Sequence, residues 1–279
     1  MKFSASAKKI LKKYQIIPSK RLGQNFLIDK FALSKVISAS ELKPEDIVLE
    51  IGPGTGILTM ELAKKARKVI AIEKDRLMLL ALKETLASFQ NIEVIHGDIL
   101  KLSPLSSKLK PYKVIANLPF YLTAPVIRKF LEAEIQPELM VFVVQKEVAQ
   151  RICSKPPKMN LLAVSVQVYA EAKIIAYISK TSFWPQPKVD SAIIKIIPLK
   201  AAPPLLLRAG LYEQFFKIVR SGFANPRKQI VNNLSRMLKL TKEETSAWLL
   251  QNNIKPTMRA EILSVEHWKA LAKTITMKK

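Results

Sequence analysis

The chain has 279 residues, 49% of them hydrophobic and 24% charged, which is typical of a soluble globular protein with one large domain or a large and a small one. Lysine and arginine (46) exceed aspartate and glutamate (22), so the formal net charge is +24. This excess predicts a polyanionic partner, above all a nucleic acid, rather than a lysine-rich surface without function or an anionic membrane. One cysteine excludes an internal disulfide, two histidines argue against a metal site, and no apolar run is long enough to span a bilayer.

The N-terminal residues 1–22 form a basic segment without acidic residues, and its cations include Lys8, Lys9, Lys12, Lys13, Lys20 and Arg21. A transit peptide is one interpretation of this composition. However, lysine outnumbers arginine, and the segment continues directly into the sequence Gln-Asn-Phe-Leu at 24–27. We therefore favour a short helix and an arm that lies beside a nucleic acid.

Apolar periodicity predicts alternating helices and strands from residue 30 onward. The expected elements are a helix at 30–42, a strand at 47–51, a helix at 57–66, a strand at 68–73, a helix at 75–86, strands at 92–95 and 112–117, a helix at 124–132 and a strand at 138–144. A helix follows, and then two isoleucine-rich strands at 174–178 and 191–197. The short connection between them predicts an antiparallel hairpin at the end of the sheet. The alternation predicts an α/β fold with a mostly parallel sheet.

The character of the sequence changes after Pro198. Residues 201–204 (Ala-Ala-Pro-Pro) predict a linker. The remaining patterns are helical, at 211–222, 226–238, 242–251 and 265–275. We therefore expect two domains, an α/β domain with its basic arm at 1–200 and a small all-helical domain at 206–279.

The stretch Val-Leu-Glu-Ile-Gly-Pro-Gly-Thr-Gly at 48–56 predicts a buried strand, a tight turn and a helix start. Its glycines allow close approach of a ligand to the backbone, and the helix start offers unpaired N–H groups. The G-x-G-x-G spacing differs from the dinucleotide pattern G-x-G-x-x-G, which argues against a nicotinamide dehydrogenase. On its own, the motif is also compatible with a strand-to-helix turn that binds nothing.

Acidic residues follow the next two strands. Glu73 ends the second strand, where a carboxylate can accept both hydroxyls of a bound ribose, whereas Asp75 has the pattern of a helix N-cap. Asp98 follows the third strand, where it can accept a hydrogen bond from an exocyclic amine such as adenine N6. A turn residue is the alternative for Asp98.

The fourth strand ends in Asn117-Leu118-Pro119-Phe120, the sharpest local motif. The Asn117 side-chain oxygen and the Leu118 carbonyl can each accept one N–H of an amino group. Pro119 fixes φ and has no competing N–H, and Phe120 offers a face on which a base can stack, worth ~1–3 kcal/mol. An ordinary turn with a core aromatic is the alternative.

Taken together, these motifs resemble the ribosomal RNA adenine N6-dimethyltransferases of the KsgA/Dim type. The resemblance rests on Gln24–Leu27, Glu50–Gly56, Ile72–Asp75, Gly97–Asp98, Asn117–Phe120, Gln145–Val148, Pro187–Ala192 and Arg259–Ser264. It covers about residues 14–275. One departure is Phe120, where tyrosine is usual in the family; the stacking face is kept and the hydroxyl is lost.

The resemblance implies a Rossmann-like, S-adenosylmethionine-dependent methyltransferase domain plus the small helical domain. The cofactor contacts that it implies are Asn25 and Leu27 to the methionine end, Gly52 and Gly54 under the cofactor, Glu73 to the ribose, Asp98 to the adenine amine, and Asn117 between cofactor and target base. The implied catalytic residues are Asn117, Leu118 and Phe120. No metal is implied, and Phe183 is a further candidate to hold the base, with packing of the hairpin as its alternative.

The implied activity is dimethylation of N6 on two adjacent adenines in the loop of the 3′-terminal hairpin of small-subunit (16S) ribosomal RNA, with a role in subunit biogenesis. We expect Arg220, Arg227 and Lys228 to bind ribosomal RNA phosphates. The alternatives are Erm-type methylation of large-subunit RNA, against which the C-terminal pattern speaks, and a non-catalytic nucleic-acid-binding factor on the same fold. We expect a cytoplasmic monomer that contacts no membrane.

Overall fold

The computed structural model of the chain describes residues 9–19, 22–102, 111–199 and 211–275. Contacts divide the chain into two compact units, residues 1–149 with 172–198 and residues 150–171 with 199–279. The sequence had placed 150–171 in the α/β domain instead. This segment groups with the C-terminal helices because its helix α7 (Leu161–Gln167) contacts α9 (Leu211–Gly222). The expected linker at 201–204 lies outside the described residues.

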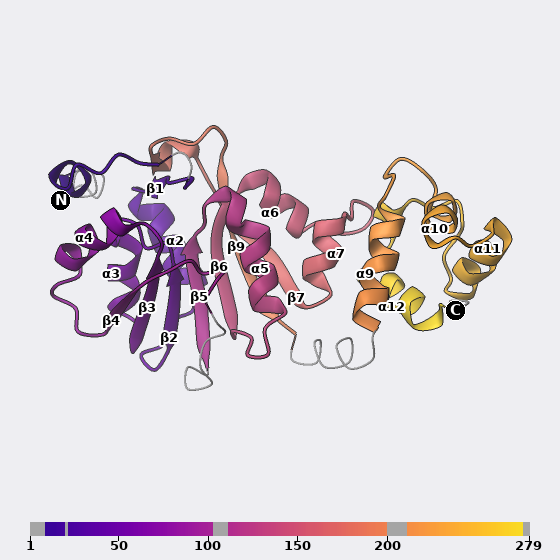
Figure 1. Cartoon of the computed structure of the whole chain (residues 1–279), viewed down its shortest axis with the longest axis horizontal. Coiled ribbons are helices and arrows are strands. Elements are labelled where there is room, and N and C mark those ends of the chain that lie inside the picture. Colours follow the sequence, from indigo (N-terminus) through magenta and orange to yellow (C-terminus); the bar gives the residue numbers. More distant parts are fainter. Residues whose placement is uncertain (1–8, 20–21, 103–110, 200–210, 276–279) are drawn as a thin grey trace. The chain divides into compact units, whose positions relative to one another are not determined.

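The first unit is built on a seven-stranded sheet with the order β4-β3-β2-β5-β6-β9-β7 (Figure 1). The first five of these strands are parallel, and β9 is antiparallel to β6. Their bounds are β2 Ile47–Ile51, β3 Lys68–Glu73, β4 Ile92–His96, β5 Tyr112–Asn117, β6 Leu139–Gln145, β7 Ala170–Ile178 and β9 Ser191–Pro198. The mostly parallel α/β fold is thereby confirmed.

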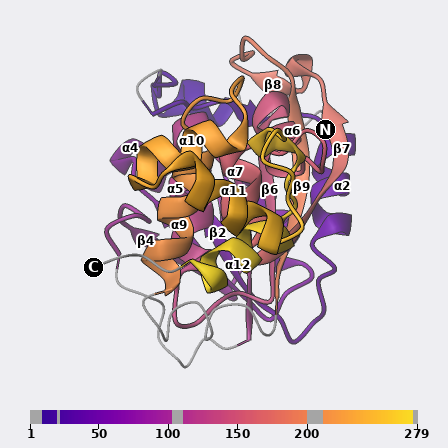
Figure 2. The same cartoon turned by 90° about the vertical axis from the view of Figure 1, so that its right-hand side faces the viewer.

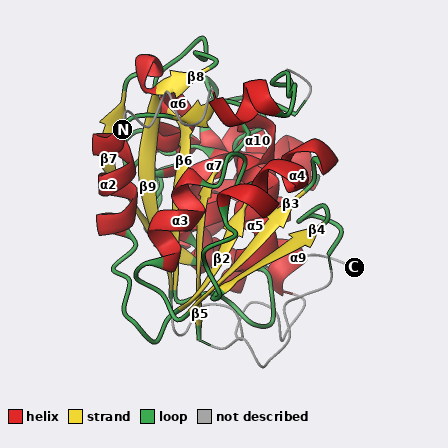
Figure 3. Cartoon of the chain, turned by 90° about the vertical axis from the view of Figure 1, so that its left-hand side faces the viewer, coloured by secondary structure: helices red, strands yellow, loops and turns green. Residues whose placement is uncertain are grey.

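Both faces of the central strands are covered, because β2 is buried at every residue and β6 at all but its last. Figure 3 shows helices on either side of the strands. Helices α2 and α3 share one core cluster with the sheet, in which Val36, Leu62 and Val141 are almost fully buried. The helices of this unit are α2 Lys30–Ala39, α3 Ile57–Ala63, α4 Arg76–Thr85 and α5 Thr123–Leu131, and α6 Lys146–Ile152 runs from the first unit into the second.

A second, two-stranded sheet was not predicted. β1 (Phe26–Leu27) pairs antiparallel with β8 (Phe183–Trp184), with Leu27 opposite Phe183. The Ile28 amide also donates to Ser182 O over 2.9 Å. This pairing ties the segment that follows the N-terminal arm to the connection between β7 and β9.

The second unit contains α7, α9, α10 (Ile230–Leu238), α11 (Lys242–Gln251) and α12 (Val265–Thr274). Figure 2 shows α9 to α12 grouped together. Trp268 of α12 is completely buried and lies 5.4 Å from the Phe223 ring, centroid to centroid. A Cβ added at Gly222 would come within 2.3 Å of the Trp268 ring, so only glycine fits at this crossing. As expected, the described residues 211–275 contain helices joined by turns and no strand.

Two local predictions in this region were wrong. The helix expected at 226–238 begins only at Ile230, because Asn233 Nδ2 donates to the carbonyls of Gly222 (2.7 Å) and Asn225 (3.0 Å) and holds the preceding residues in a turn. Between β6 and β7 the chain forms two helices, α6 and α7, where one was expected. Asn160 separates them by capping α7, since its Oδ1 accepts from the Ala163 amide over 3.0 Å.

Candidate active site

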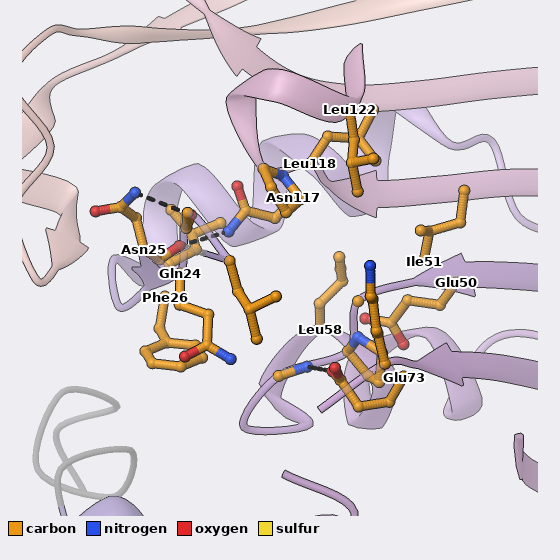
Figure 4. Close-up of a pocket in the computed structure, with 18 of the residues that line it drawn as sticks. Gln24, Asn25, Phe26, Glu50, Ile51, Leu58, Glu73, Asn117, Leu118 and Leu122 are labelled. Carbon is orange, nitrogen blue, oxygen red and sulfur yellow. Dashed lines mark hydrogen bonds between the residues drawn. The ribbon is translucent and has the colours of Figure 1, made fainter. Parts of the chain in front are cut away.

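A pocket lies at the carboxyl ends of β2, β3 and β5, beside the β1–β8 pair (Figure 4). The predicted cofactor and base residues all line it: Asn25, Leu27, Gly52, Gly54, Glu73, Asp98, Asn117, Leu118 and Phe120. Parallel strands bring their carboxyl ends to one edge, so motifs far apart in sequence converge here. The lining also includes residues that the sequence did not assign to the site, namely Phe26, Glu50, Lys74 and Tyr121.

The glycine turn forms the floor of the pocket. Gly52 has φ +66° and Gly54 has φ +56°, a left-handed backbone that favours glycine at both positions. A Cβ on Gly54 would lie 2.9 Å from the Phe26 ring. A Cβ on Gly52 would meet nothing within 4 Å, so the backbone there faces open space of a size that a ligand can fill. The turn is therefore a cradle for close approach of a ligand.

Glu73 closes the side of the pocket next to β3. Its Oε2 accepts from the Gly54 amide (3.2 Å) and its Oε1 from the Asp75 amide (2.8 Å), so the carboxylate is fixed relative to the glycine turn. Burial raises the pKa of Glu73, while the amides that donate to it act in the opposite direction. Each oxygen keeps a lone pair for a further donor, as a ribose hydroxyl would require.

Asp98 lies beyond β4, where a salt bridge that the sequence did not predict holds it. Lys74 Nζ is 2.9 Å from Asp98 Oδ2, and the Leu100 amide donates to Oδ1 over 3.0 Å. The hydrogen bond from Lys74 lowers the pKa of Asp98, so its carboxylate is anionic at neutral pH. The lysine thereby makes Asp98 a dependable acceptor.

Glu50 is the most unusual group in the pocket. It is only 1% exposed, and its Oε2 has no hydrogen-bond partner among the described residues. Desolvation raises the pKa of Glu50 to about 8, so the side chain is largely protonated at neutral pH. A buried, incompletely bonded carboxyl group at the pocket wall is a candidate contact for a cationic ligand.

Asn117 lies between the glycine turn and the β1 segment (Figure 4). Its Nδ2 donates to Asn25 O over 2.8 Å, which fixes the amide plane and leaves Oδ1 as the acceptor. The Leu118 amide donates to Val143 O over 3.1 Å and holds the turn against β6. Asn25, in turn, donates from Nδ2 to Gly23 O (3.2 Å).

Aromatic residues lie on two sides of this turn. Phe120 begins a single 3-10 turn, Phe120–Leu122, and is half-buried, and the neighbouring Tyr121 is 52% exposed. Phe183 lines the pocket from β8 but is mostly buried in the core beneath α2. Tyr121, directly after Phe120, thus adds an exposed phenol ring to the pocket lining.

The N-terminal arm packs beside residues that line the pocket, and the sequence had not identified these contacts. Leu11 and Ile16 pack with Phe26 and with Met78 of α4. Gln24 Nε2 donates to Asp75 Oδ2 over 2.8 Å. Of the basic arm residues, Lys8, Lys20 and Arg21 lie outside the described ranges.

Arg220, Arg227 and Lys228 belong to the second unit. Arg220 is exposed in the last turn of α9, and the other two are exposed in the turn before α10. The Ile230 amide donates to Met258 O over 2.7 Å, which brings Lys255 and Arg259 onto the segment beside this turn. The sequence had not grouped these last two cations with the predicted cluster.

The described residues were also compared with the requirements of a metal site and of a membrane-spanning helix. No group of three or more histidine, cysteine, aspartate or glutamate side chains suited to a metal ion occurs within the described ranges. Those ranges also contain no helix that is long and apolar enough to cross a membrane.

The fold and this pocket define a Rossmann-like methyltransferase: a glycine turn after the first strand of the sheet, acids after the next two, and an Asn-Leu-Pro-Phe turn after the fourth. Residues 18–277 match the Ribosomal RNA adenine dimethylase family, and the chain belongs to that family. The resemblance read from the motifs is confirmed.

Similar sequences carry the same description. A Ribosomal RNA small subunit methyltransferase A from Dehalococcoides mccartyi is 43% identical over 275 residues, which cover 98% of this chain and 93% of that protein. A protein of the same name from Alkaliphilus metalliredigens is 39% identical and covers 97% of this chain and 96% of its own length.

Solved structures confirm the fold but do not separate the substrates. The 23S rRNA methyltransferase ErmE has a TM-score of 0.72 at 29% identity, covering 89% of this chain and 98% of its own. A dimethyladenosine transferase from Plasmodium falciparum also has a TM-score of 0.72, at 26% identity, covering 87% and 94%. Equal similarity to both means that the backbone alone does not select the RNA.

Proposed function

We propose that this protein dimethylates N6 of two adjacent adenines in the loop of the 3′-terminal hairpin of small-subunit ribosomal RNA, and thereby acts in small-subunit biogenesis. Family membership and the names of the relatives, which are 37–43% identical, support the small subunit as the source of the RNA. The observation that carries the chemistry is the amide of Asn117, whose nitrogen is held by Asn25 O so that its oxygen is the acceptor.

The residues of the pocket fit S-adenosylmethionine, the methyl donor of this family. The open cradle over Gly52 leaves room for it, and the incompletely bonded carboxyl group of Glu50 suits its positive charge. Glu73 would hold the ribose and Asp98 the adenine amine, with Asn25 and Leu27 near the methionine end. When bound, the cofactor supplies an electrophilic methyl group on a sulfonium.

The residues of the Asn-Leu-Pro-Phe turn would prepare the target amine. The N6 lone pair of adenine is delocalised into the ring, so the amine is a poor nucleophile. Asn117 Oδ1 and Leu118 O would accept its two N–H groups and favour a pyramidal nitrogen with its lone pair directed at the methyl group. Catalysis would then rest on positioning, without a strong base. This fits the described lining of the pocket, which contains no histidine.

The target base must leave its helix or loop stack to reach these acceptors. Phe120 would provide the face on which it stacks, and Phe183 would limit the pocket from β8. The loss of the tyrosine hydroxyl at Phe120 leaves stacking intact, since stacking needs only the ring. Arg220, Arg227 and Lys228, the basic residues of the second unit, would contact phosphates of the ribosomal RNA.

The decisive experiment combines purified protein, methyl-labelled S-adenosylmethionine and ribosomal subunits from a strain that lacks the modification. We expect N6,N6-dimethyladenosine in small-subunit RNA, and none with Asn117→Ala. Label in large-subunit RNA would instead identify an Erm-type enzyme. Binding of RNA without any label would identify a non-catalytic factor on the same fold.

We further propose that the protein works as a monomer in the cytoplasm, where its ribosomal substrate is assembled. Light scattering of the purified chain alone and with subunits tests the first statement. A mass of twice 31.5 kDa for the free protein would contradict it.

A further inference from the structure

Three segments at the carboxyl edge of the sheet carry exposed lysines and an exposed tyrosine. Lys146 begins α6, Tyr177 is the penultimate residue of β7, and Lys180 begins the single 3-10 turn that follows it. Lys188 lies three residues before β9. We call Lys146, Tyr177, Lys180 and Lys188 the lysine–tyrosine surface. Figure 3 shows β8 and α6 at this same end of the sheet.

Asp190 holds these segments in place. Its backbone carbonyl accepts from the Lys146 amide over 3.0 Å, and its Oδ1 accepts from the Lys180 amide over 3.1 Å. The next residue, Ser191, pairs with Gln145 in the sheet. Backbone contacts therefore fix where the lysine side chains start, and the surface is part of the folded unit rather than a chance grouping of flexible residues.

The side chains of this surface lack protein partners that would neutralise them. Tyr177 is 54% exposed, and Lys146 Nζ lies 5.3 Å from the centroid of its ring. In the described chain, no carboxylate lies within salt-bridge distance of Lys146, Lys180 or Lys188. Val189, beside Lys188, is also 45% exposed. A half-exposed aromatic ring with one ammonium group beside it, and exposed lysines on the adjoining segments, is suited to a base that stacks and to phosphates that flank it.

The same connection reaches the pocket. Only two residues separate Lys180 from Phe183, which lines the pocket and pairs with Leu27. The chain then returns past Lys188 to β9. A strand of RNA with one base in the pocket would thus have its neighbouring nucleotides beside the lysine–tyrosine surface.

We propose that the lysine–tyrosine surface binds the single-stranded RNA next to the target adenine, with one base stacked on Tyr177 and phosphates at Lys146, Lys180 and Lys188. This inference rests on the proposed function. RNA is favoured over an acidic protein because the chain carries a net charge of +24 and the exposed Tyr177 ring has the Lys146 ammonium group beside it, which suits a stacked base flanked by phosphates.

The test measures binding of an RNA fragment that contains the 3′-terminal hairpin of small-subunit ribosomal RNA, over a series of salt concentrations. Tyr177→Ala should weaken binding about five- to tenfold, whereas Tyr177→Phe should bind as the wild type does. Lys146→Ala should reduce the slope of log K against log salt by about one. In methylation assays the variant that combines Lys146→Ala with Tyr177→Ala should have a higher KM than the wild type and the same kcat.

Lys43→Ala is the matched control, because Lys43 is an exposed lysine that precedes β2 at the opposite edge of the sheet. Calorimetry of S-adenosylmethionine binding reports whether each variant keeps its fold and cofactor pocket.

If the Lys146→Ala, Tyr177→Ala double variant binds the fragment as tightly as Lys43→Ala, the proposal is wrong. It is also wrong if binding to the fragment is unchanged and only binding to intact subunits falls, since a ribosomal protein would then be the partner. Wild-type protein that binds the fragment but never methylates subunits would overturn the proposed function alone.

Discussion

The amino and carboxyl ends of the parallel strands differ in how the buried ionisable side chains are paired. At the amino end, Lys113 Nζ donates to Asp46 Oδ2 (2.7 Å) and Glu41 O (2.5 Å), so a buried cation has a carboxylate and a carbonyl as acceptors. At the carboxyl end, Glu50 keeps one oxygen without a partner, and Glu73 is held by backbone amides rather than by a cation. The paired charges serve the fold, whereas the incomplete ones are available to a ligand.

This difference has a cost at the carboxyl end. A buried carboxyl group without a counter-ion favours its neutral form, which is why the pKa of Glu50 rises to about 8. A fold selected only for stability would pair or replace such a group. Its presence in the pocket is therefore an argument for a function, and the two ends can be tested separately.

The largest effect is expected from breaking the amino end. Lys113→Met leaves Asp46 buried, at 9% side-chain exposure, without its cation. We expect the free energy of unfolding to fall by about 3–5 kcal/mol, as is typical when one member of a buried ion pair is removed. Urea unfolding measures this. Methylation per folded molecule should change little, because Lys113 does not line the pocket.

Lys195→Met is the matched control for this variant. Lys195 is as buried as Lys113, but its partner Glu41 has a side chain that is 66% exposed. Water can hydrate Glu41 after the substitution, so the loss of stability should be clearly smaller than for Lys113→Met. Equal losses would show that burial of the lysine stem, rather than an unpaired acid, determines the cost.

Asn117→Ala breaks the carboxyl end. It removes the proposed acceptor for the target amine and the donor to Asn25 O. We expect kcat to fall about 10²–10³-fold, as when one preorganised polar group is removed from an active site. Single-turnover methylation of subunits measures this, and the melting temperature should stay close to that of the wild type.

Asn91 offers a control with the same chemistry. Its Nδ2 donates to Ala63 O (2.8 Å) and Ala66 O (3.0 Å) at the end of α3, away from the pocket lining. Asn91→Ala should lower stability by about 1 kcal/mol and leave kcat unchanged. A loss of activity in both variants would assign the effect of Asn117 to folding.

Much of the carboxyl end could be predicted because its information is local. A glycine turn, an acid after a strand and an Asn-Leu-Pro-Phe turn each have recognisable sequence patterns, and parallel topology gathers them at one edge. The resemblance to a family then supplied roles for Glu73, Asp98 and Asn117. Residues outside those patterns, such as Lys74 beside Asp98, were missed because a lone lysine carries no signal of its partner.

The amino end could not be predicted, because its contacts depend on register between distant strands. Lys113 meets Asp46 only because Val48 of β2 pairs with Lys113 of β5. Asp46 and Lys113 themselves are 67 positions apart in the chain. The β1–β8 pair presents the same problem, since two-residue strands have no periodicity to detect. The missed start of α10 reflects hydrogen bonds from the Asn233 side chain to the carbonyls of Gly222 and Asn225, which hold the preceding residues in a turn.

Glu50→Gln separates charge from shape in the pocket. The pKa of Glu50 is about 8 when folded and near 4.5 otherwise, so the native state binds the extra proton between these values. The free energy of unfolding should therefore fall as the pH rises from about 4.5 to 8 and then level off. Glutamine cannot ionise, so Glu50→Gln should gain on the order of a few kcal/mol over the wild type by pH 9.

Urea unfolding of both proteins at several pH values measures this difference, in which the other titrating groups cancel. The two proteins should be most alike near pH 5, where Glu50 is protonated in the native state. A difference that does not vary with pH would show that Glu50 is ionised throughout. Binding of S-adenosylmethionine should weaken in Glu50→Gln, since Glu50 can release its proton when a cation binds nearby and glutamine cannot.

The smallest effect concerns the arm beside the pocket. Lys13 Nζ lies 2.6 Å from Glu84 Oε2, and the Tyr14 hydroxyl also bonds to Glu84, so one exposed carboxylate on α4 ties down the arm. Glu84→Gln should change the melting temperature little, because exposed ion pairs contribute little. Amide exchange at residues 10–16 should nevertheless become a few-fold faster, since the arm opens locally.

Glu93→Gln is the control, because it breaks a comparable exposed ion pair, with Lys68 at 2.6 Å on the neighbouring strand. It should leave amide exchange of the arm unchanged. If Glu84→Gln accelerates it no more than Glu93→Gln does, the arm is held by Leu11 and Ile16 in its apolar cluster rather than by Glu84.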